Sequence, residues 1–203
     1  MGRRSVHTPE ELRDLILNAA TDLIEQGGLA ALSAREIARA IGYSPGTLYN
    51  VFENLDDVVL TIEARLLDQL SAKLSEAADG AAPRERISRL AHAYLSFTPQ
   101  NPKLWTLLFE PHLPADRAVP PWYKTKLEGL MPQLEDALAA RLDGHEPASI
   151  KQAARVLWAG VHGITSLSTA DKLSTITSEA AGPLVEDLLQ TYLAGLVRSG
   201  NDV

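Results

Sequence analysis

The segment from Ser33 to Phe52 constrains the fold most, because it fits two short helices joined by a tight turn. Ser33 can accept hydrogen bonds from the free N–H groups of a first helix, and Gly42 can adopt the left-handed conformation that ends it. Ser44 followed by Pro45 is typical of a second helix start, since proline lacks the N–H that a first turn leaves without a partner. Apolar residues follow at helical spacing in each half. The segment therefore predicts a helix-turn-helix unit.

The second of these helices has polar side chains at the positions that its apolar residues leave facing outward. Thr47 and Tyr49 have hydroxyl groups that can donate to phosphate, and the Asn50 amide can read adenine in the major groove. Gly46 leaves room for close approach, and Arg35, in the first turn of the preceding helix, can meet a phosphate. A packing corner in an unrelated helical protein would show the same spacing. Spacing alone therefore leaves DNA binding and a structural role both open.

The residues before this unit predict one more helix. Thr8-Pro-Glu-Glu is a capping box with proline at the first helical position, and apolar residues then repeat at helical spacing up to Gln26-Gly-Gly. The three helices would form a small domain, residues 1–53, which buries too little surface to be robust alone. Arg3 and Arg4 form an arm that either reaches a minor groove or remains a solvated tail.

Residues 54–203 predict a second, larger helical domain. Asn54 can cap a long helix that runs to about Ala78. The helices expected after it are Pro83 to Thr98, Lys103 to Phe109, Trp122 to about Leu142 with a kink near Gly129 and Pro132, the segment around Trp158, and Gly182 to Val197. No strand-like alternation of any length appears, so the expected fold class is all-α with about nine helices.

Composition excludes several classes of protein. The 203 residues include no cysteine, which rules out a disulfide framework, thiol catalysis and cysteine-ligated zinc. No apolar run approaches the ~18 residues needed to span a bilayer, and the first residues do not resemble a signal peptide, so we expect a cytoplasmic protein with no membrane partner. The net charge of −7 argues against indiscriminate binding to nucleic acid, although it allows a local site.

The histidines give no sign of catalysis or of a metal site. His7, His92, His112, His145 and His162 are scattered, with no nucleophile beside a base at helical spacing and no phosphate-binding loop. We therefore expect no enzyme activity, no catalytic residues, no metal and no cofactor.

Aromatic residues are few and gather in consecutive helices of the second domain. Each one taken alone is expected to pack in a core, and together they predict a cavity between helices for a small molecule. The candidate ligand-binding residues are Tyr94, Trp105, Phe109, Trp122, Trp158 and His162. His162, four residues after Trp158, is more typical of a buried imidazole with satisfied hydrogen bonds than of a ligand-sensing group.

Two runs of the chain closely resemble the DNA-binding domain of TetR-family transcriptional regulators. They are Gly28-Leu-Ala-Ala-Leu-Ser-Ala-Arg-Glu-Ile-Ala and Ile41-Gly-Tyr-Ser-Pro-Gly-Thr-Leu-Tyr-Asn-Val-Phe. The resemblance implies that DNA is contacted by Tyr43, Ser44, Pro45, Gly46, Thr47 and Tyr49. Two positions depart from the family's pattern, because Val51 stands where a His or Tyr is usual and Leu55 where a Lys is usual. The missing Lys would remove a phosphate contact at the start of the next helix.

Two C-terminal segments extend this resemblance over nearly the whole chain. Trp158-Ala-Gly-Val-His-Gly163 resembles the Trp-x-Gly-x-His-Gly signature of one subgroup of TetR-family C-terminal domains. Asn101-Pro-Lys-Leu-Trp-Thr-Leu-Leu-Phe109 also looks like that subgroup. The resemblance implies a helical domain for ligand binding and dimerisation, and it names no particular effector.

The last helix has a wide apolar stripe, with paired apolar residues at nearly every turn from Leu184 to Val197. Part of this stripe is expected to face a second subunit, in a four-helix interface with the Trp158 helix. Gly160 and Gly163 keep one side of that helix small, which allows another helix to approach closely. A last helix buried within the monomer is the alternative. We favour the dimer because helix-turn-helix modules usually bind two half-sites.

Together these features predict a ligand-responsive, DNA-binding transcriptional regulator, and specifically a repressor that a small molecule releases from its operator. A homodimer formed through the last two helices would bind a palindromic double-stranded operator, and the effector would stabilise another spacing of the two modules. The nearest alternative is a small-molecule-binding helical dimer with weak or lost DNA binding. A helical enzyme and a structural adaptor for a protein partner are the two remaining alternatives.

Overall fold

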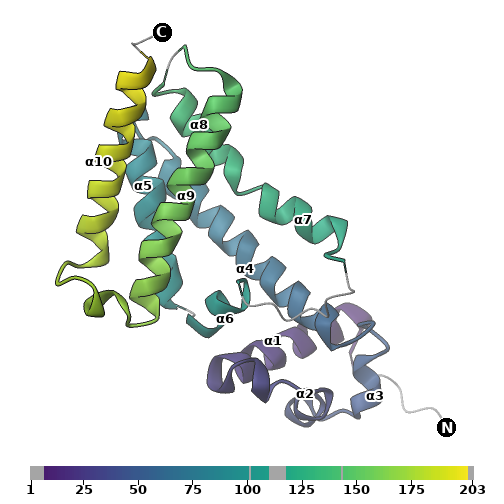
Figure 1. Ribbon diagram of the computed structural model, residues 1–203. Coiled ribbons are helices and arrows are strands. Elements are labelled where there is room, and N and C mark those ends of the chain that lie inside the picture. Colours follow the sequence, from purple (N-terminus) through teal and green to yellow (C-terminus); the bar gives the residue numbers. More distant parts are fainter. Residues whose placement is uncertain (1–6, 101, 110–117, 143, 201–203) are drawn as a thin grey trace. The chain divides into compact units, whose positions relative to one another are not determined.

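The computed structural model describes residues 7–100, 102–109, 118–142 and 144–200, and every regular element in these ranges is a helix (Figure 1). In chain order the elements are α1 (Pro9–Gly27), η1 (Leu29–Ala31), α2 (Ala34–Ile41), α3 (Pro45–Leu48), α4 (Leu55–Ala78), α5 (Pro83–Phe97), η2 (Thr98–Gln100), α6 (Pro102–Leu107), α7 (Pro121–Glu128), α8 (Met131–Ala139), α9 (Pro147–Thr169), η3 (Leu173–Thr175) and α10 (Ala181–Gly200), where η marks a short 3-10 helix. The all-α fold class is confirmed. The predicted arm at Arg3 and Arg4 lies outside the described residues.

Helices α1 and α2 have the caps that the sequence predicts. At the start of α1 the Glu11 N–H donates to Thr8 Oγ1 (3.2 Å), and the Thr8 N–H donates to a carboxylate oxygen of Glu11 (2.7 Å). Ser33 Oγ accepts from the Glu36 N–H at the start of α2 (3.2 Å). Gly42 ends α2 with a φ of 73°, a conformation that strains residues with a side chain.

Helix α3 has only four residues, and the chain continues in turns toward Phe52. Ser44 precedes α3 as predicted, but its hydroxyl does not cap the backbone; Ser44 Oγ lies 3.0 Å from Thr47 Oγ1 instead. Leu48 and Phe52 are each 2 % exposed. The predicted apolar face is therefore buried at Leu48 and Phe52, whereas Val51, its third residue, is partly exposed and the regular helix ends before it.

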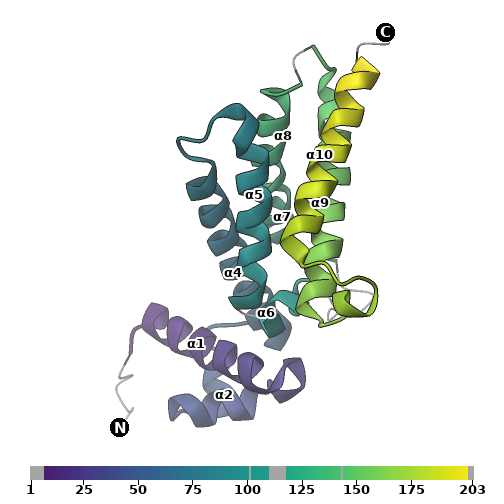
Figure 2. The same ribbon diagram turned by 90° about the vertical axis from the view of Figure 1, so that its left-hand side faces the viewer.

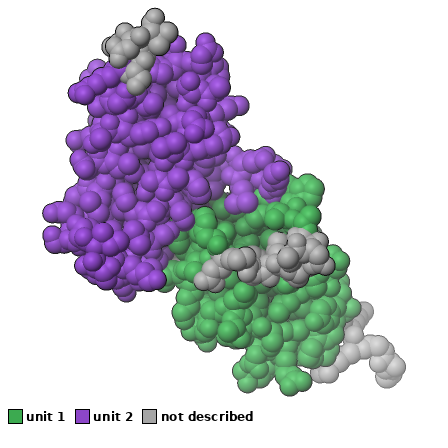
Figure 3. All heavy atoms as spheres, in the orientation of Figure 1, with its two compact units in different colours: residues 1–67, 101–123 green, residues 68–100, 124–203 purple. Residues whose placement is uncertain are grey.

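The chain divides into two compact units (Figure 3). Unit 1 comprises residues 1–67 and 101–123, and unit 2 comprises residues 68–100 and 124–203. Helix α4 is one continuous helix that contributes its first part to unit 1 and its last part to unit 2. The predicted domain boundary after residue 53 stays a prediction. The two units are defined by which residues pack together, whereas the predicted domains are defined by their expected functions.

In unit 1, α1 packs against α2 and α6, and α2 packs against α3. The core is apolar, and its fully buried side chains include Ile16, Leu17, Ile24 and Ile37. One cation, Arg13, packs against this core. Its guanidinium lies 4.3 Å from the centroid of the Phe52 ring and donates to Thr61 Oγ1 in α4. These contacts fix α1 to the residues that follow the helix-turn-helix segment.

Unit 2 is a helical bundle in which α9 packs against α8 and α10, while α5 packs against α8, α9 and α10 (Figures 1 and 2). Each helix buries one apolar face because its apolar residues recur at helical spacing. The buried residues at the centre include Ile87, Leu90, Leu157, Val185 and Leu189. No helix among the described residues is long and apolar enough to cross a membrane.

Helices α7 and α8 occupy the segment predicted as one helix with a kink. Helix α7 ends at Glu128, and α8 begins at Met131. The interruption falls at Gly129, where the sequence places the kink, because glycine is a poor helix former and Pro132 suits the first turn of a new helix. Leu130 and Met131 consequently sit at a helix junction, and both contribute to the cavity described below.

Candidate nucleic-acid interface and ligand cavity

The predicted DNA-binding residues are all accessible at the surface of unit 1, in α2, in α3 and around the turns that flank α3. Arg35, Ser44, Pro45, Gly46, Tyr49 and Asn50 are exposed, and Tyr43 and Thr47 are partly exposed. Leu48 lies among them in sequence and is buried in the core. The segment thus has a buried apolar side and an accessible side with hydroxyl and amide groups, which can donate to a DNA backbone or to base edges.

Tyr43 is held by a residue that sequence reasoning missed. His7 Nδ1 lies 2.6 Å from the Tyr43 hydroxyl, and the ring centroids are 6.0 Å apart. A neutral Nδ1 without a proton accepts from the Tyr43 O–H, whereas an Nδ1–H donates to the Tyr43 oxygen and leaves the O–H to donate elsewhere. His7 therefore decides whether Tyr43 can serve as a donor to phosphate.

Positive charge near this surface is sparse. Arg39 is paired with Glu36 within α2, so its charge is locally balanced. Arg35 forms no ion pair with any residue that the structure describes, and it is exposed in the first turn of α2. Binding of DNA at this surface would therefore depend on hydroxyl and amide groups and on very few cations.

The start of α4 is acidic. Asn54 Oδ1 accepts from the Asp57 N–H (3.0 Å), which caps the helix as the sequence predicts. Asp56 and Asp57 occupy its first turn, and the partly exposed Leu55 stands where the family usually has a Lys. Two carboxylates at a helix N-terminus stabilise the helix but repel a phosphate that approaches the same end.

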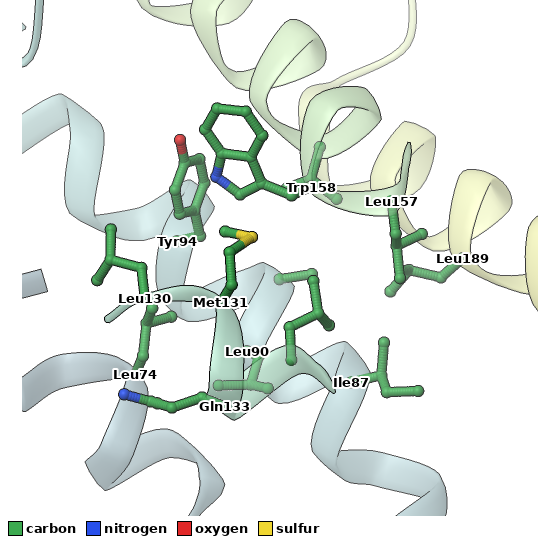
Figure 4. Close-up of a pocket in the computed structure, with 13 residues that line it drawn as sticks. Leu74, Ile87, Leu90, Tyr94, Leu130, Met131, Gln133, Leu157, Trp158 and Leu189 are labelled. Atoms are coloured by element: carbon green, nitrogen blue, oxygen red, sulfur yellow. The ribbon is translucent and has the colours of Figure 1, made fainter. Parts of the chain in front are cut away.

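Unit 2 contains a cavity of about 50 Å³. Its lining comes from α4, α5, α8, α9 and α10 and from Leu130 just before α8. These residues are aliphatic except for Tyr94, Met131, Gln133 and Trp158 (Figure 4). An apolar cavity with a few polar groups is the usual form of a small-molecule site.

Tyr94 and Trp158 line this cavity, and His162, which is not part of the lining, contacts both of them. The Tyr94 hydroxyl lies 2.9 Å from His162 Nδ1, and the His162 ring stacks on Trp158 with centroids 5.2 Å apart and planes 11° apart. Ser166 Oγ lies 3.2 Å from His162 Nε2, so both ring nitrogens have a partner. Burial raises the pKa of the Tyr94 hydroxyl and lowers the pKa of His162, which keeps both groups uncharged at neutral pH.

The other three predicted ligand-binding residues belong to unit 1 and do not line this cavity. Trp105 is buried, with its ring centroid 5.3 Å from that of Phe109. Trp122 is exposed and meets the Tyr123 ring edge-on at 5.7 Å. A ligand-binding role for Trp105, Phe109 and Trp122 stays a prediction.

Sequence reasoning missed Gln133, Met131 and Leu74, which also line the cavity. Gly129 and Pro132 gave a usable signal for Met131, because a helix junction often borders a cavity. Nothing in the sequence distinguishes Gln133 from a glutamine on a solvated face, since its position depends on the packing of α8 against other helices.

Helices α9 and α10 lie side by side and approach closely at Gly160 (Figures 1 and 2). A Cβ placed on Gly160 would lie 2.7 Å from Leu188 Cδ2, so the glycine permits this approach within one subunit. At Gly163 a Cβ would meet no atom within 4 Å. Val156 in α9 and Val197 in α10 are 43 % and 44 % exposed, so apolar surface remains on both helices.

Two family matches cover most of the chain. Residues 16–62 match the family described as "Bacterial regulatory proteins, tetR family". Residues 87–192 match the "Tetracyclin repressor-like, C-terminal domain", and this match alone extends over half of the 203 residues. The Trp-x-Gly-x-His-Gly subgroup suggested by residues 158–163 stays a prediction.

Individual proteins are similar over nearly the whole length. The chain is 24% identical over 197 residues to an uncharacterized HTH-type transcriptional regulator of Mycobacterium tuberculosis, covering 96% of this chain and 86% of the relative. A solved structure of a protein with unknown function from Rhodococcus sp. RHA1 has a TM-score of 0.78 and 23% identity, covering 97% of this chain and 100% of the other. A TetR-like transcriptional regulator from Rhodococcus sp. RHA1 has a TM-score of 0.64 and 22% identity, covering 93% and 100%. The two structures share the fold, and the two family matches identify the chain as a member of the TetR family of bacterial transcriptional regulators.

Proposed function

We propose that this regulator is a repressor that a small molecule releases from its operator. A homodimer would place two helix-turn-helix segments at the spacing of successive major grooves, about 34–36 Å, and would bind a palindromic double-stranded site. An effector in the cavity of unit 2 would stabilise a different spacing, and coupling of about 1–3 kcal/mol would change DNA affinity 5- to 150-fold. The proposal includes no catalytic step, and it places the protein in the cytoplasm with its DNA.

One observation supports the DNA-binding part above all others. Thr47, Tyr49 and Asn50 are accessible while Leu48, between them in sequence, is buried. A purely structural corner would bury the polar side chains or scatter them. Here hydroxyl and amide groups share one accessible segment, where they can donate to phosphate.

The dimer is proposed to form through α9 and α10. Within the subunit, α10 buries Val185, Leu189 and Leu193 on one face. Leu188 and Leu196 remain only partly covered. This uncovered apolar surface supports a second subunit as the partner, because packing α9 and α10 of two subunits together would give a four-helix interface.

A second candidate function is a ligand-binding dimer with weak or lost DNA binding. The acidic start of α4, with Asp56 and Asp57 beside Leu55, favours it. Salt distinguishes the two functions, since specific binding to DNA through phosphate contacts weakens as salt concentration rises.

The test is fluorescence anisotropy with duplex DNA from upstream of the chain's own gene. Replacing Thr47→Ala and Tyr49→Phe should weaken binding by roughly fivefold each, because each change removes one hydroxyl donor to the backbone. Thr175→Ala, at an exposed threonine of unit 2, is the matched control and should bind as tightly as wild type. Unchanged affinity in the first two variants would remove both residues from the interface. Wild-type protein that binds no duplex at any salt concentration would favour the second function.

A further inference from the structure

The cavity of unit 2 has no charged side chain in its described lining. A carboxylate, phosphate or ammonium group buried there would lose its hydration and gain no ion-pair partner, which is strongly unfavourable. Its walls are mostly leucine, isoleucine, valine and alanine side chains. The lining therefore favours an uncharged ligand with a mainly hydrocarbon surface.

The polar group of Tyr94 in the lining already has a hydrogen-bond partner. The Tyr94 hydroxyl lies 2.9 Å from His162 Nδ1, and the His162 ring stacks on Trp158. His162 Nε2 in turn bonds Ser166 Oγ. A ligand that accepted a hydrogen bond from one of these side chains would have to break an existing hydrogen bond between them. Tyr94 therefore offers the ligand its ring surface.

Gln133 is the polar residue with hydrogen-bonding capacity to spare. Its Nε2 lies 3.3 Å from the backbone oxygen of Ser71 and 3.4 Å from Ser71 Oγ. A carbonyl oxygen can only accept a hydrogen bond, so the amide nitrogen of Gln133 must face α4, as Figure 4 shows. This fixes which of the two terminal atoms of the amide is the oxygen, Oε1. Oε1 is buried and accepts no hydrogen bond from any residue that the structure describes.

An acceptor buried in this way is unfavourable until a donor reaches it. Gln133 lines the cavity, so a ligand in the cavity is the group placed to supply that donor. The cavity is small, and Met131 is suited to move aside for a larger ligand because its thioether chain is unbranched and flexible. In Figure 4 this side chain extends toward the rings of Tyr94 and Trp158.

We propose that the effector is an uncharged, mainly hydrocarbon molecule with a hydrogen-bond donor, such as a phenol or an alcohol, and that Gln133 Oε1 accepts this donor. This inference rests on the proposed function. Gln133 also joins α8 to Ser71 of α4, a helix that continues without a break from Ala78 back to Leu55. The ligand's donor would therefore bond the same amide group that bonds Ser71 of α4. Gln133 would in this way couple ligand binding to that helix.

The test uses three probes of matched shape on the full-length protein without DNA. They are para-ethylphenol, its methyl ether para-ethylanisole, and para-ethylbenzoate, and binding is measured by isothermal titration calorimetry and by the shift in melting temperature. The phenol should bind wild type roughly five- to tenfold more tightly than the ether, because only the phenol can donate to Oε1. The benzoate should bind at least tenfold more weakly than the phenol, because its charge has no partner.

Gln133→Met keeps a side chain of similar length and removes the acceptor. In this variant the phenol and the ether should bind equally, whereas Gln152→Met, at an exposed glutamine of α9, should keep the wild-type preference. The comparison of phenol with ether in wild type requires no variant, so a poorly folded Gln133→Met protein leaves the proposal falsifiable.

Benzoate binding as tight as phenol binding would overturn the ligand class. An unchanged phenol preference in Gln133→Met, or no binding of the phenol up to its solubility limit, would overturn the role of Gln133. Because no DNA is present, these outcomes are separate from failure of the repressor proposal, which would appear as phenol binding that leaves DNA affinity unchanged.

Discussion

The Tyr94 hydroxyl of α5 lies 2.9 Å from Nδ1 of His162 in α9, and the histidine ring stacks on Trp158. This bridge joins two helices beside an apolar cavity. Tyr94 and His162 each satisfy a polar atom of the other, so the loss of either one leaves a group of the other without this partner. The bridge therefore stabilises unit 2 and also fixes the ring surfaces that face the cavity.

Removing the Tyr94 hydroxyl should destabilise the fold. Tyr94→Phe leaves His162 Nδ1 without this partner, and we expect the free energy of unfolding to fall by about 1–2 kcal/mol. Urea denaturation at pH 7.5 measures the change. Tyr192→Phe, at a partly exposed tyrosine of α10, is the control and should change stability by less than about 0.5 kcal/mol. Equal losses in the two variants would contradict the bridge.

Acid should weaken the fold partly through His162. Burial lowers the pKa of His162 below its ordinary value of 6.5, so the unfolded chain takes up a proton at a higher pH than the folded chain does. Stability from this group is complete above pH 6.5, and it is lost as the pH falls through 6.5 toward the lowered pKa. Urea denaturation at intervals between pH 8 and pH 5 tests this, with His162→Gln as the comparison. The variant should lose less stability over that range, and identical pH profiles would contradict the prediction.

Leu55 offers a way to strengthen DNA binding. Leu55→Lys places a cation at the acidic start of α4, where a phosphate contact is missing, and we expect tighter binding with a salt dependence steeper by about 0.9 in log–log slope. Fluorescence anisotropy at several salt concentrations measures both quantities. Leu127→Lys, at an exposed leucine of α7 in unit 2, adds the same charge elsewhere. If both variants bind DNA equally well, the gain comes from net charge and not from a contact at residue 55.

The two glycines of α9 should respond differently to alanine. At Gly163 a Cβ meets nothing within 4 Å, so Gly163→Ala should gain about 1 kcal/mol of helix propensity and raise the melting temperature by about 2–4 °C. At Gly160 a Cβ would lie 2.7 Å from Leu188 Cδ2. In Gly160→Ala the cost of moving the Leu188 side chain therefore offsets the gain in helix propensity. Differential scanning calorimetry compares the two variants. Equal stabilisation would contradict the close approach of α10, and a loss at Gly163 would indicate that a partner subunit packs there.

Features that depend on a few neighbouring residues could be predicted from the sequence. The capping box at Thr8, the Ser33 cap and the left-handed Gly42 all act within one helical turn, and all three are confirmed. The all-α class follows from the same local signals, repeated along the chain. The helix start at Ser44 and Pro45 is also confirmed, and the Ser44 hydroxyl contacts Thr47 Oγ1 and not a backbone N–H.

Features that depend on long-range packing could not be predicted. Glu63 is buried beside Tyr123, whose pKa is raised by burial and by the Glu63 charge, although nothing in the sequence distinguishes Glu63 from a surface glutamate. Gln133 and Ser71 meet across 62 positions of the sequence. The candidate ligand-binding residues are divided between the two units, because residues 101–123 belong to unit 1.

The stacking of Trp158 on His162 gives the cavity an optical reporter of its own. Trp105 and Trp122 belong to unit 1, so replacing both with phenylalanine would leave a single indole, at the cavity wall. Indole emission shifts in wavelength with local polarity and is quenched by a charged imidazole in contact. Unlabelled compounds could then be screened by intrinsic fluorescence, and the same signal would distinguish entry of a ligand from protonation of the histidine.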